Sequence, residues 1–495
     1  MTDSLVSQDP NGPGPSDSSK HSGRPDQAAK PGSWADLLGP QHLAAALVLA
    51  GGVALYATNV YLTAALMPSA ITEIGGQEYY AWVVTSFLTA SVIASMLVNR
   101  VLGAAGPAKA YVLAFLIFGT GSLVNLLSPN MEIFLLGRMV QGLGGGLLAG
   151  LGFAVIRTVL PARLWTRAAG LVSAMWGVGS LVGPALGGLF AQFGLWRGAF
   201  GLLLLITLVL AFLSRRALPH HPESQAAPSP VPVLALILLT LAAAAFSVTS
   251  VLPRGVWTLL GLLLGVLLLL AFVWRERSSS VTVLPKMTYQ RGNRLKWVYL
   301  ALGAFGACAM VEAFVPLFGQ ELGGLVPLSA GFLGAALSVG WTSSQLLSVS
   351  LSSDAGKRRV RLLGPVLLTL GLVGYGVLQQ PGGGLWLIIG WAAALLLAGV
   401  GIGVAFPHFS TAALTSTDDE EEGRKAAAGI STTQLIANAV VSAFAGILVN
   451  LGAPSMLDSA RYMAFGIAAI AVLSVAAAVI SLRRTETKEQ VGRIG

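Results

Sequence analysis

Two ionisable side chains in this chain stand inside long apolar runs, where a charge is costly. Arg138 lies in the run LLGRMVQGLGGG, and Glu312 lies in the run ACAMVEAFVPLF. An arginine at the centre of a membrane helix costs at least about 2.5 kcal/mol on insertion scales, and such residues are functional by default. Glu312 is a candidate to bind a proton or a cationic substrate. The residues alone leave structural alternatives open, namely a hydrogen bond for Glu312 and an ion pair or bonds to carbonyls for Arg138.

Four amide side chains form a second set of candidates, because they too lie inside apolar runs. They are Gln141, Gln345, Gln434 and Asn438. Gln434 and Asn438 are four residues apart and therefore share one face of a helix. We expect these amides to line a substrate cavity, and packing between helices is the alternative for each of them.

Signatures of enzymatic chemistry are absent from the sequence. No stretch has the G-x-x-x-x-G-K-[ST] form that ATP hydrolysis needs, and no His/Cys cluster has metal-ligand spacing. Cys308 is the one cysteine, so a disulfide framework is excluded. We therefore expect a protein that is not an enzyme, with no cofactor and no metal, and an ion gradient as its energy source.

The elements that must position these residues are apolar helices. Charged residues make up 10% of the chain and hydrophobic ones 55%, against about 25% and about 45–50% in soluble domains. An apolar run of about 20 residues spans the hydrocarbon core as a helix, and helices satisfy their own backbone hydrogen bonds there. The sequence predicts an all-α polytopic membrane protein with fourteen spans, at 43–68, 79–99, 108–127, 132–156, 168–192, 198–214, 231–251, 256–274, 297–319, 328–350, 362–379, 384–411, 426–450 and 462–482.

The basic residues predict the orientation. With the N-terminus inside, every Lys and Arg falls in an inside segment except Arg138, Arg197, Arg254 and Arg461. This is the positive-inside pattern, and it makes both termini cytoplasmic. The net charge of +9 therefore reflects topology and not nucleic-acid binding. Arginine outnumbers lysine 22 to 8, which is typical of a GC-rich bacterium, so we expect a multi-pass protein of a bacterial cytoplasmic (inner) membrane.

The spans are predicted to form two six-helix bundles with two additional central helices. Segment 167–188 aligns without gaps on segment 426–447, at the fifth helix of each bundle, and internal repeats are typical of secondary transporters. The expected division is 1–38, a disordered cytoplasmic tail; 39–217, the first bundle; 218–230, a cytoplasmic linker; 231–276, two extra helices; 277–296, a cytoplasmic loop; 297–482, the second bundle; and 483–495, a cytoplasmic tail.

Several motifs resemble those of the major facilitator superfamily. LLGRMVQGLGGG resembles its helix-4 signature, and GVGSLVGPALGG at 177–188 resembles the helix-5 signature of its antiporters. RERS at 275–278 with the following LPKMTYQRGNR resembles a loop of the fourteen-helix drug:proton antiporter branch. The resemblance implies the major facilitator fold and a role in proton coupling for Arg138. It also implies a conformational role for Gly179, Gly183, Pro184, Gly187 and Gly188.

Two departures from this family pattern affect the mechanism. The loop expected between helices 2 and 3, NRVLGAAGPAK at 99–109, lacks the family's aspartate and arginine. We expect the matching loop of the second half to gate the cytoplasmic side instead, through Asp354, Lys357 and Arg358. The family's membrane aspartate in helix 1 aligns with Asn59, which cannot titrate. We expect Asn59 to line the cavity.

The function expected from these observations is secondary active transport by alternating access, with proton-coupled export of lipophilic or amphipathic small organic compounds. Drug efflux, and with it multidrug resistance, is what the resemblance implies. One alternative is a carrier for a specific metabolite, siderophore or lipid, and another is a non-transporting membrane sensor on a carrier fold. The expected partners are the lipid bilayer, a small organic substrate and protons, with no nucleic acid, and the expected state is a monomer.

Overall fold

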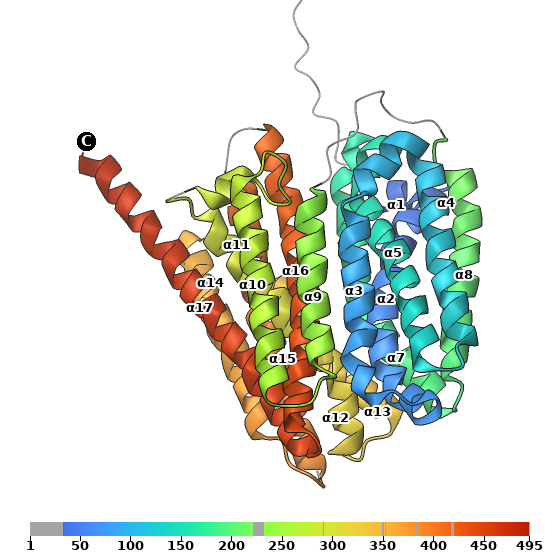
Figure 1. Ribbon diagram of the computed structural model, residues 1–495. Coiled ribbons are helices and arrows are strands. Elements are labelled where there is room, and N and C mark those ends of the chain that lie inside the picture. The colour runs from blue at the N-terminus through green and yellow to red at the C-terminus, as the bar shows by residue number, and fades with distance from the viewer. Residues whose placement is uncertain are drawn as a thin grey trace, which may run out of the picture.

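The computed structural model describes residues 33–220, 232–290, 292–348, 351, 353–382, 384–416 and 420–494. Every regular element within these ranges is helical, which confirms the all-α prediction. Counting α11 and α12 as one interrupted helix, fourteen long helical segments lie in this part of the chain. They stand side by side with their axes roughly upright (Figure 1).

The long helices are α2 (Leu43–Ile74), α3 (Tyr80–Ser95), α4 (Val98–Leu127), α5 (Met131–Ala154), α7 (Trp165–Gln192), α8 (Trp196–Ala217), α9 (Val233–Thr249), α10 (Val256–Ser278), α11 (Leu295–Ala309), α12 (Val315–Glu321), α13 (Pro327–Ser348), α14 (Asp354–Val377), α15 (Leu385–Leu414), α16 (Glu420–Gly452) and α17 (Met456–Ile494). The short ones are α1 (Trp34–Leu37), η1 (Gln77–Tyr79), α6 (Ile156–Val159), η2 (Ala162–Leu164), η3 (Lys286–Tyr289) and η4 (Met310–Ala313). Eleven described helices are long and apolar enough to cross a membrane, and α9 is a shorter apolar helix.

The ninth predicted span is not the continuous helix that its hydrophobicity suggested. Over the predicted range 297–319, α11 ends at Ala309, the chain passes through the 3-10 turn η4, and α12 begins at Val315. Pro316 is the cause, because proline has no N–H to donate and its ring clashes with the carbonyl four residues earlier. That carbonyl belongs to Glu312, so the helix is interrupted at the buried carboxylate.

Two further segments differ from their prediction. Residues 99–109 were expected to form a loop, but they lie within α4, which is interrupted at Gly106 with φ 74°. Residues 33–38 were assigned to a disordered tail, but Ser33 and Asp36 form a capping box on the short helix α1. Residues 1–32 of that tail and 221–230 of the predicted linker lie outside the described residues.

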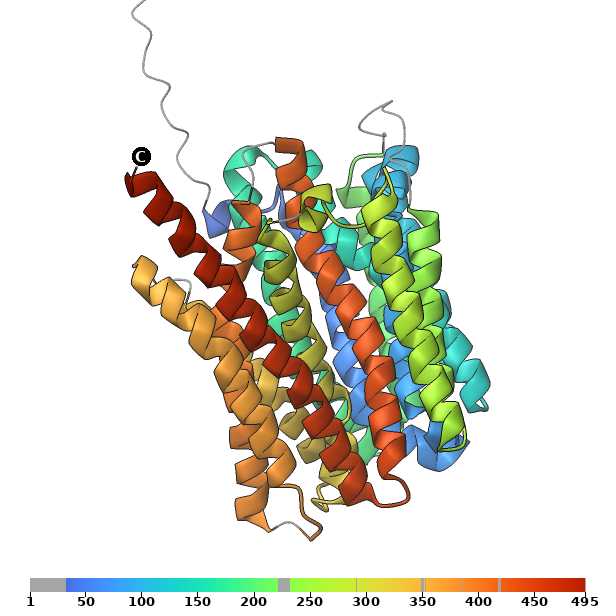
Figure 2. The same cartoon turned by 60° about the vertical axis from the view of Figure 1, so that its left-hand side comes forward.

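The helices pack as two groups that meet along a seam. In the first half α2 packs on α7, and α4 packs on α5 and α8; in the second half α13, α14 and α15 pack together, as do α11, α16 and α17. The seam between the halves is made by α7 against α13 and by α3 against α16. Figure 2 shows α14 and α17 tilting away from the other helices toward the upper face.

The extra helices α9 and α10 pack on each other beside the seam (Figures 1 and 2). The indole of Trp82 on α3 donates to the carbonyl of Ser247 on α9 at 2.6 Å. Asn450 on α16 donates to the carbonyl of Ser250, just after α9, at 2.6 Å. One end of α9 is therefore bonded to both halves of the molecule.

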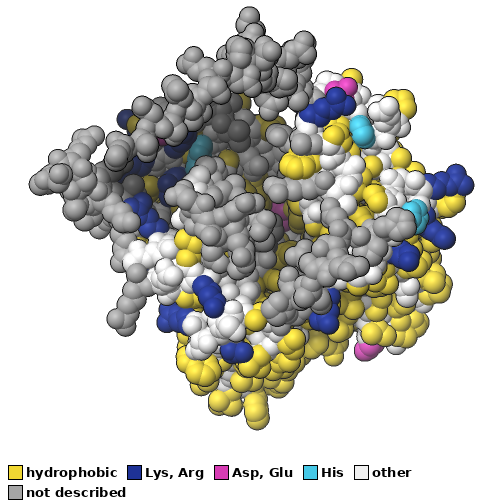
Figure 3. Space-filling view, turned by 90° about the horizontal axis from the view of Figure 1, so that it is seen from above, with side chains coloured by type: hydrophobic (Ala, Val, Ile, Leu, Met, Phe, Trp, Pro, Cys, Tyr) yellow, Lys and Arg dark blue, Asp and Glu magenta, His cyan; other side chains and the backbone are white. Residues whose placement is uncertain are grey.

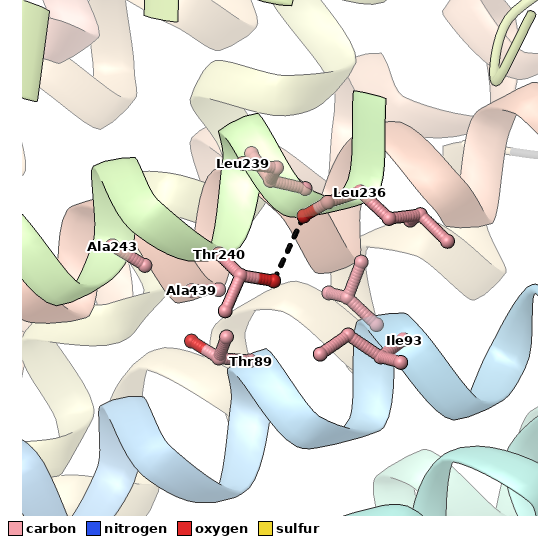
Figure 4. A pocket seen from close by; sticks show the side chains of 8 residues that line it. Thr89, Ile93, Leu236, Leu239, Thr240, Ala243 and Ala439 are labelled. Atoms are coloured by element: carbon pink, nitrogen blue, oxygen red, sulfur yellow. Dashed lines mark hydrogen bonds between the residues drawn. The ribbon is translucent and has the colours of Figure 1, made fainter. Parts of the chain in front are cut away.

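A narrow crevice remains where α9 lies along the seam (Figure 4). Thr89, Val92 and Ile93 come from α3, Ala439 comes from α16, and the rest of the lining comes from α9. The hydroxyl of Thr240 donates within its own helix to the carbonyl of Leu236 at 2.8 Å. The crevice therefore presents an almost wholly apolar lining.

The upper face of Figure 1 is the basic end of the molecule. Exposed residues at described helix ends there include Arg100, Arg216, Arg277 and Arg359. Figure 3 looks onto this face and shows Lys and Arg side chains around a hollow, with an acidic side chain visible inside it. We call this face the basic end and the other face the opposite end.

Candidate functional site

Arg138 on α5 is buried in the first half and makes three hydrogen bonds. Its Nε donates to the carbonyl of Val83 on α3 at 3.2 Å, and its Nη1 donates to Oδ1 of Asn59 on α2 at 3.1 Å. Nη1 also donates to Oε1 of Gln141 at 2.5 Å. The guanidinium lies 4.3 Å from the centroid of the Phe87 ring, within the range of a cation–π interaction. Arg138 thus ties three helices together at one point.

A second layer of polar residues fixes Gln141 behind Arg138. Asn125 on α4 donates to Oε1 of Gln141 at 3.1 Å, and Nε2 of Gln141 donates to the hydroxyl of Ser122 at 2.9 Å. Gln141 is fully buried, so its side chain holds the guanidinium and faces α4. This is a supporting position and differs from the cavity-lining position expected from the sequence.

Arg138 has no carboxylate partner among the residues that the structure describes. The two ion pairs found there join Arg197 to Glu73 and Lys357 to Asp354. Of the alternatives left open by the sequence, the structure therefore has bonds to a carbonyl and to amides, and not an ion pair. A buried charge held only by neutral dipoles carries a large desolvation penalty.

Glu312 lies in η4, at the interruption between α11 and α12, and is 4% exposed. Its Oε1 accepts the backbone N–H of Ser338 on α13 at 2.7 Å, and its Oε2 accepts the Ser338 hydroxyl at 3.0 Å. Broken membrane helices at the midplane are common sites for substrates and coupling ions in transporters. Here the break places the Glu312 carboxyl group beside α13, where the backbone N–H and the hydroxyl of Ser338 both donate to it.

Two tyrosines of the first half reach this region across the seam. The Ser338 hydroxyl lies 3.5 Å from the hydroxyl of Tyr61 on α2. The hydroxyl of Tyr80, at the start of α3, donates to the carbonyl of Ala313 at 2.9 Å, and the Tyr80 ring packs on Phe314 with centroids 5.4 Å apart. Glu312 therefore lies between two contacts that join the halves.

The remaining amides occupy separate places in the second half. Gln345 accepts the indole N–H of Trp341 at 2.8 Å on the same helix, α13. In the amide orientation that satisfies its hydrogen bonds, Asn438 on α16 donates to the carbonyls of Gln434 at 3.0 Å and Gly306 at 2.9 Å. Asn438 thus packs α16 onto α11, while Gln434 and Gln345 are partly exposed. The structure does not gather these three amides around Glu312.

Comparison with known proteins decides the family. The sequence profile of the Major Facilitator Superfamily matches residues 49–442, which is most of the chain.

The chain belongs to the major facilitator superfamily.

Its relatives include a protein of Mycobacterium tuberculosis named a probable multidrug-efflux transporter, which is 43% identical over 475 residues, or 94% of this chain and 99% of the relative. The multidrug efflux pump SdrM of Staphylococcus aureus is 23% identical over 63% of this chain and 70% of the relative. Among solved structures, the inward-open xylose transporter XylE of E. coli has a TM-score of 0.60 at 15% identity and covers 89% of this chain and 95% of its own. At that identity the likeness concerns the fold alone, and it agrees with the predicted major facilitator fold.

Membership of this superfamily makes the chain a multi-pass membrane transporter and not an enzyme. The residues of the described ranges contain no group of three His, Cys, Asp or Glu side chains that could hold a metal ion.

The residues of the helix-5 motif lie on α7 and pack against two different helices. A Cβ added at Gly183 would come 2.8 Å from the carbonyl oxygen of Thr58, and one at Gly187 would come 2.3 Å from that of Leu62. Gly179, like these two, faces α2. These three glycines therefore let α7 approach α2 within the first half, as small residues do in membrane helix packing.

The other two motif residues face the second half. A Cβ at Gly188 would come 2.6 Å from the Cα of Leu328, and one at Gly331 would come 2.9 Å from the carbonyl oxygen of Pro184. Both contacts join α7 to α13 toward the opposite end. Pro184 and Gly188 therefore lie at the seam itself.

The expected gate residues lie at the basic end, at the start of α14. Lys357 pairs with Asp354 at 3.5 Å, one turn apart, and the Asp354 side chain is fully exposed. Arg358 is exposed as well. Within the described residues this ion pair is local to α14 and does not cross the seam.

Sequence reasoning missed Tyr61, Tyr80 and Ser338. All three are polar groups inside or at the edge of apolar runs, which is the signal that singled out the amides. The contact between Tyr80 and Ala313 spans 233 positions of the chain, and that between Tyr61 and Ser338 spans 277. No local pattern in the sequence links residues so far apart.

Proposed function

We propose that this chain is a proton-coupled exporter of lipophilic or amphipathic small organic compounds, working by alternating access. The two halves, residues 39–217 and 297–482, move against each other while α9 and α10 follow beside the seam. The basic end faces the cytoplasm of a bacterium, both termini lie inside, and the working unit is a monomer in the cytoplasmic membrane.

The arrangement of the seam supports alternating access. Toward the opposite end, Gly188 packs on Leu328 and Pro184 packs on Gly331, so α7 and α13 are in backbone contact. At the basic end the face is hollowed (Figure 3). These features correspond to a state that is closed at the opposite end and open toward the basic end. Transport then requires the seam contacts to break.

The observation that carries the proposal is the position of Glu312. It is a buried acid at a helix break, it is bonded to Ser338, and it lies between the Tyr61 and Tyr80 contacts across the seam. An ionised carboxylate only accepts hydrogen bonds, whereas the neutral acid carries a donor. Binding of a proton therefore changes the bonding of Ser338, and with it the contacts that join the halves.

Arg138 supports coupling from the first half. Its charge is held by Asn59, Gln141 and the Val83 carbonyl, with no carboxylate among its described partners. We propose that Asn59 and Gln141 act as positioning residues for this charge. Proton coupling in this proposal uses the fixed positive charge of Arg138 in the first half and the titratable acid Glu312 at the seam.

The substrate class comes from the relatives. The mycobacterial relative that covers almost the whole chain is named a probable multidrug-efflux transporter, and more distant relatives include a multidrug efflux pump. We therefore propose that this chain also exports several lipophilic compounds. The partly exposed Trp341, Gln345 and Gln434 of the second half are suited to contact compounds of this kind.

Transport in inverted membrane vesicles tests the proposal. Vesicles with an imposed inside-acid pH gradient are offered a panel of lipophilic cations and neutral amphipathic compounds, with and without an uncoupler. We expect uptake of several compounds, and we expect the uncoupler to abolish it. Uptake of a single compound would favour a specific carrier. Absence of any substrate-driven proton flux, in vesicles that contain folded protein, would reject proton-coupled export and favour a sensor.

A further inference from the structure

The loop that follows α10 is held over the helix end by one carboxylate. Glu276 is 1% exposed, and its oxygens accept the backbone N–H groups of Val283 at 2.9 Å and Leu284 at 3.2 Å. They also accept the hydroxyl of Tyr289 at 3.1 Å. The Glu276 carboxylate therefore holds residues 279–290 at the end of α10, and both of its oxygens already accept hydrogen bonds.

Local bonds stiffen the same loop. The hydroxyl of Ser279 donates to the carbonyl of Val281 at 2.8 Å, and that of Thr282 donates to the carbonyl of Leu284 at 2.6 Å. Burial, together with the neighbouring Glu276 carboxylate, raises the pKa of the Tyr289 hydroxyl. Tyr289 therefore stays protonated and keeps donating. These hydrogen bonds support the loop without a ligand.

An opening of about 260 Å³, more open than enclosed, lies beside this loop and is lined by Glu276, Arg277, Ser279, Lys286, Tyr289 and Gln290. A water molecule occupies about 30 Å³ of liquid, so the opening is large enough for a phosphate group. Three of these side chains, those of Glu276, Ser279 and Tyr289, already form hydrogen bonds within the loop. The donors left for a ligand are the side chains of Arg277, Lys286 and Gln290.

The opening carries two cations, Arg277 and Lys286, and one carboxylate, that of Glu276. Arg277 and Lys286 are exposed, and neither belongs to an ion pair within the part of the chain that the structure describes. An arginine fork and a lysine ammonium are the usual donors to phosphate oxygens. The chemistry of the opening therefore fits an anion with several oxygens.

The position of the opening identifies the source of that anion. Only 17% of the apolar window of α10 is buried, the smallest share among the eleven candidate spans. Its inward stripe consists of Thr258, Gly265, Phe272 and Glu276, and its remaining face points away from the other helices. Trp274 is 69% exposed, and tryptophan is enriched at the membrane–water boundary. Arg277 lies three residues further along the chain, near the end of α10.

We propose that Arg277, Lys286 and Gln290 form a binding site for the phosphate of an anionic phospholipid, whose acyl chains lie along α10. The lipid would anchor the extra helix pair at the basic end. This site is independent of Glu312 and of the transport cycle, and it does not require the chain to be an exporter.

Native mass spectrometry of the purified full chain in detergent tests the site, with phosphatidylglycerol as the probe and phosphatidylcholine as the zwitterionic reference. The test variant is the double substitution Arg277→Gln, Lys286→Gln. Its matched control is Arg215→Gln, Arg216→Gln, which removes two exposed charges from the same end of α8. We expect the test variant to hold phosphatidylglycerol about tenfold more weakly than wild type, and the control to change little.

Two further variants and a competition with inorganic phosphate complete the test. Lys286→Arg keeps the charge and should keep the lipid, and Lys286→Gln alone serves if the double variant does not elute as folded protein. Millimolar inorganic phosphate should not displace the lipid, because the acyl chains add to its binding. Equal lipid retention by wild type and the test variant, an equal loss in the control, or displacement by inorganic phosphate would each overturn the assignment.

Discussion

The hydroxyl of Tyr80 donates a 2.9 Å hydrogen bond to the backbone carbonyl of Ala313, the residue next to Glu312 in the interrupted helix. Tyr80 belongs to the first half and Ala313 to the second. The bond uses a carbonyl that the helix break leaves without a regular helical partner, because η4 ends at Ala313. A polar contact across the seam is thus built on the same irregularity that exposes the Glu312 carboxyl to Ser338.

Removal of this bond should loosen the opposite end. In Tyr80→Phe the ring can still pack on Phe314, but the Ala313 carbonyl is left unsatisfied, at a cost of about 1–3 kcal/mol. We expect a thiol introduced at Leu328 to react with an impermeant reagent from outside about fivefold faster or more. The parent chain, whose Cys308 is buried, sets the background. Tyr79→Phe is the control, and an equal increase there would assign the effect to the helix end in general.

Gly188 offers a steric test of the same closure. An added Cβ would lie 2.6 Å from the Cα of Leu328, so Gly188→Ala should prevent α7 and α13 from closing at the opposite end. We expect export to fall by about tenfold or more, since overpacking typically costs about 1–3 kcal/mol. Gly170→Ala on the same helix meets nothing within 4 Å and should transport normally. Wild-type export by Gly188→Ala would remove this contact from the cycle.

Arg138→Ala should abolish gradient-driven export while the protein still inserts. The substitution leaves the oxygens of Asn59 and Gln141 without their donor, and it removes the one charge at this point. Arg138→Lys keeps the charge but loses the planar fork, so we expect it to recover only part of the activity. Vesicle uptake, normalised to the amount of folded protein, is the measurement. Full activity in the alanine variant would leave Arg138 with a structural role.

Glu312→Gln should separate coupling from binding. Glutamine is nearly isosteric and resembles the neutral acid: its oxygen can accept the Ser338 N–H and its NH₂ can donate to the Ser338 hydroxyl, but it cannot titrate. We expect loss of uptake driven by the pH gradient, retention of substrate exchange, and loss of a pH-dependent step in binding. Glu321→Gln, an exposed glutamate at the end of α12, should behave as wild type. If Glu312 instead pairs with the substrate charge, the variant will lose cations selectively and keep neutral compounds. Identical pH profiles for wild type and Glu312→Gln would remove Glu312 from the mechanism.

Cysteine labelling at the two ends of α10 tests which end of the molecule faces the cytoplasm. Arg254, in the turn before α10, and Ser278, at its end, are both exposed. In intact cells a cysteine at Arg254 should react with an impermeant thiol reagent, whereas one at Ser278 should react only after permeabilisation. The reverse pattern would mean that the basic end faces outward.

Sequence alone determined most of the helices and singled out two ionisable groups inside apolar runs, Arg138 and Glu312. Run length and charge cost are local properties, so the all-α class and most helix positions follow from composition along the chain. Arg138 and Glu312 stood out for the same reason, because an ionisable group in an apolar run is costly wherever the chain folds. Pro316 is a local signal for the interruption at Glu312, whereas the length of the apolar run predicts a continuous helix.

Only the tertiary structure decided which groups meet. Gln141 was expected at a cavity, yet it faces α4, because Asn125 and Ser122 there satisfy its amide. The helix-5 motif divides between α2 and α13 according to the direction each residue faces on α7, and local spacing does not reveal which helix is the neighbour. Tyr80 reaches Ala313 across 233 residues. A hydrogen bond depends on a separation of about 3 Å and on direction, and helix packing sets both.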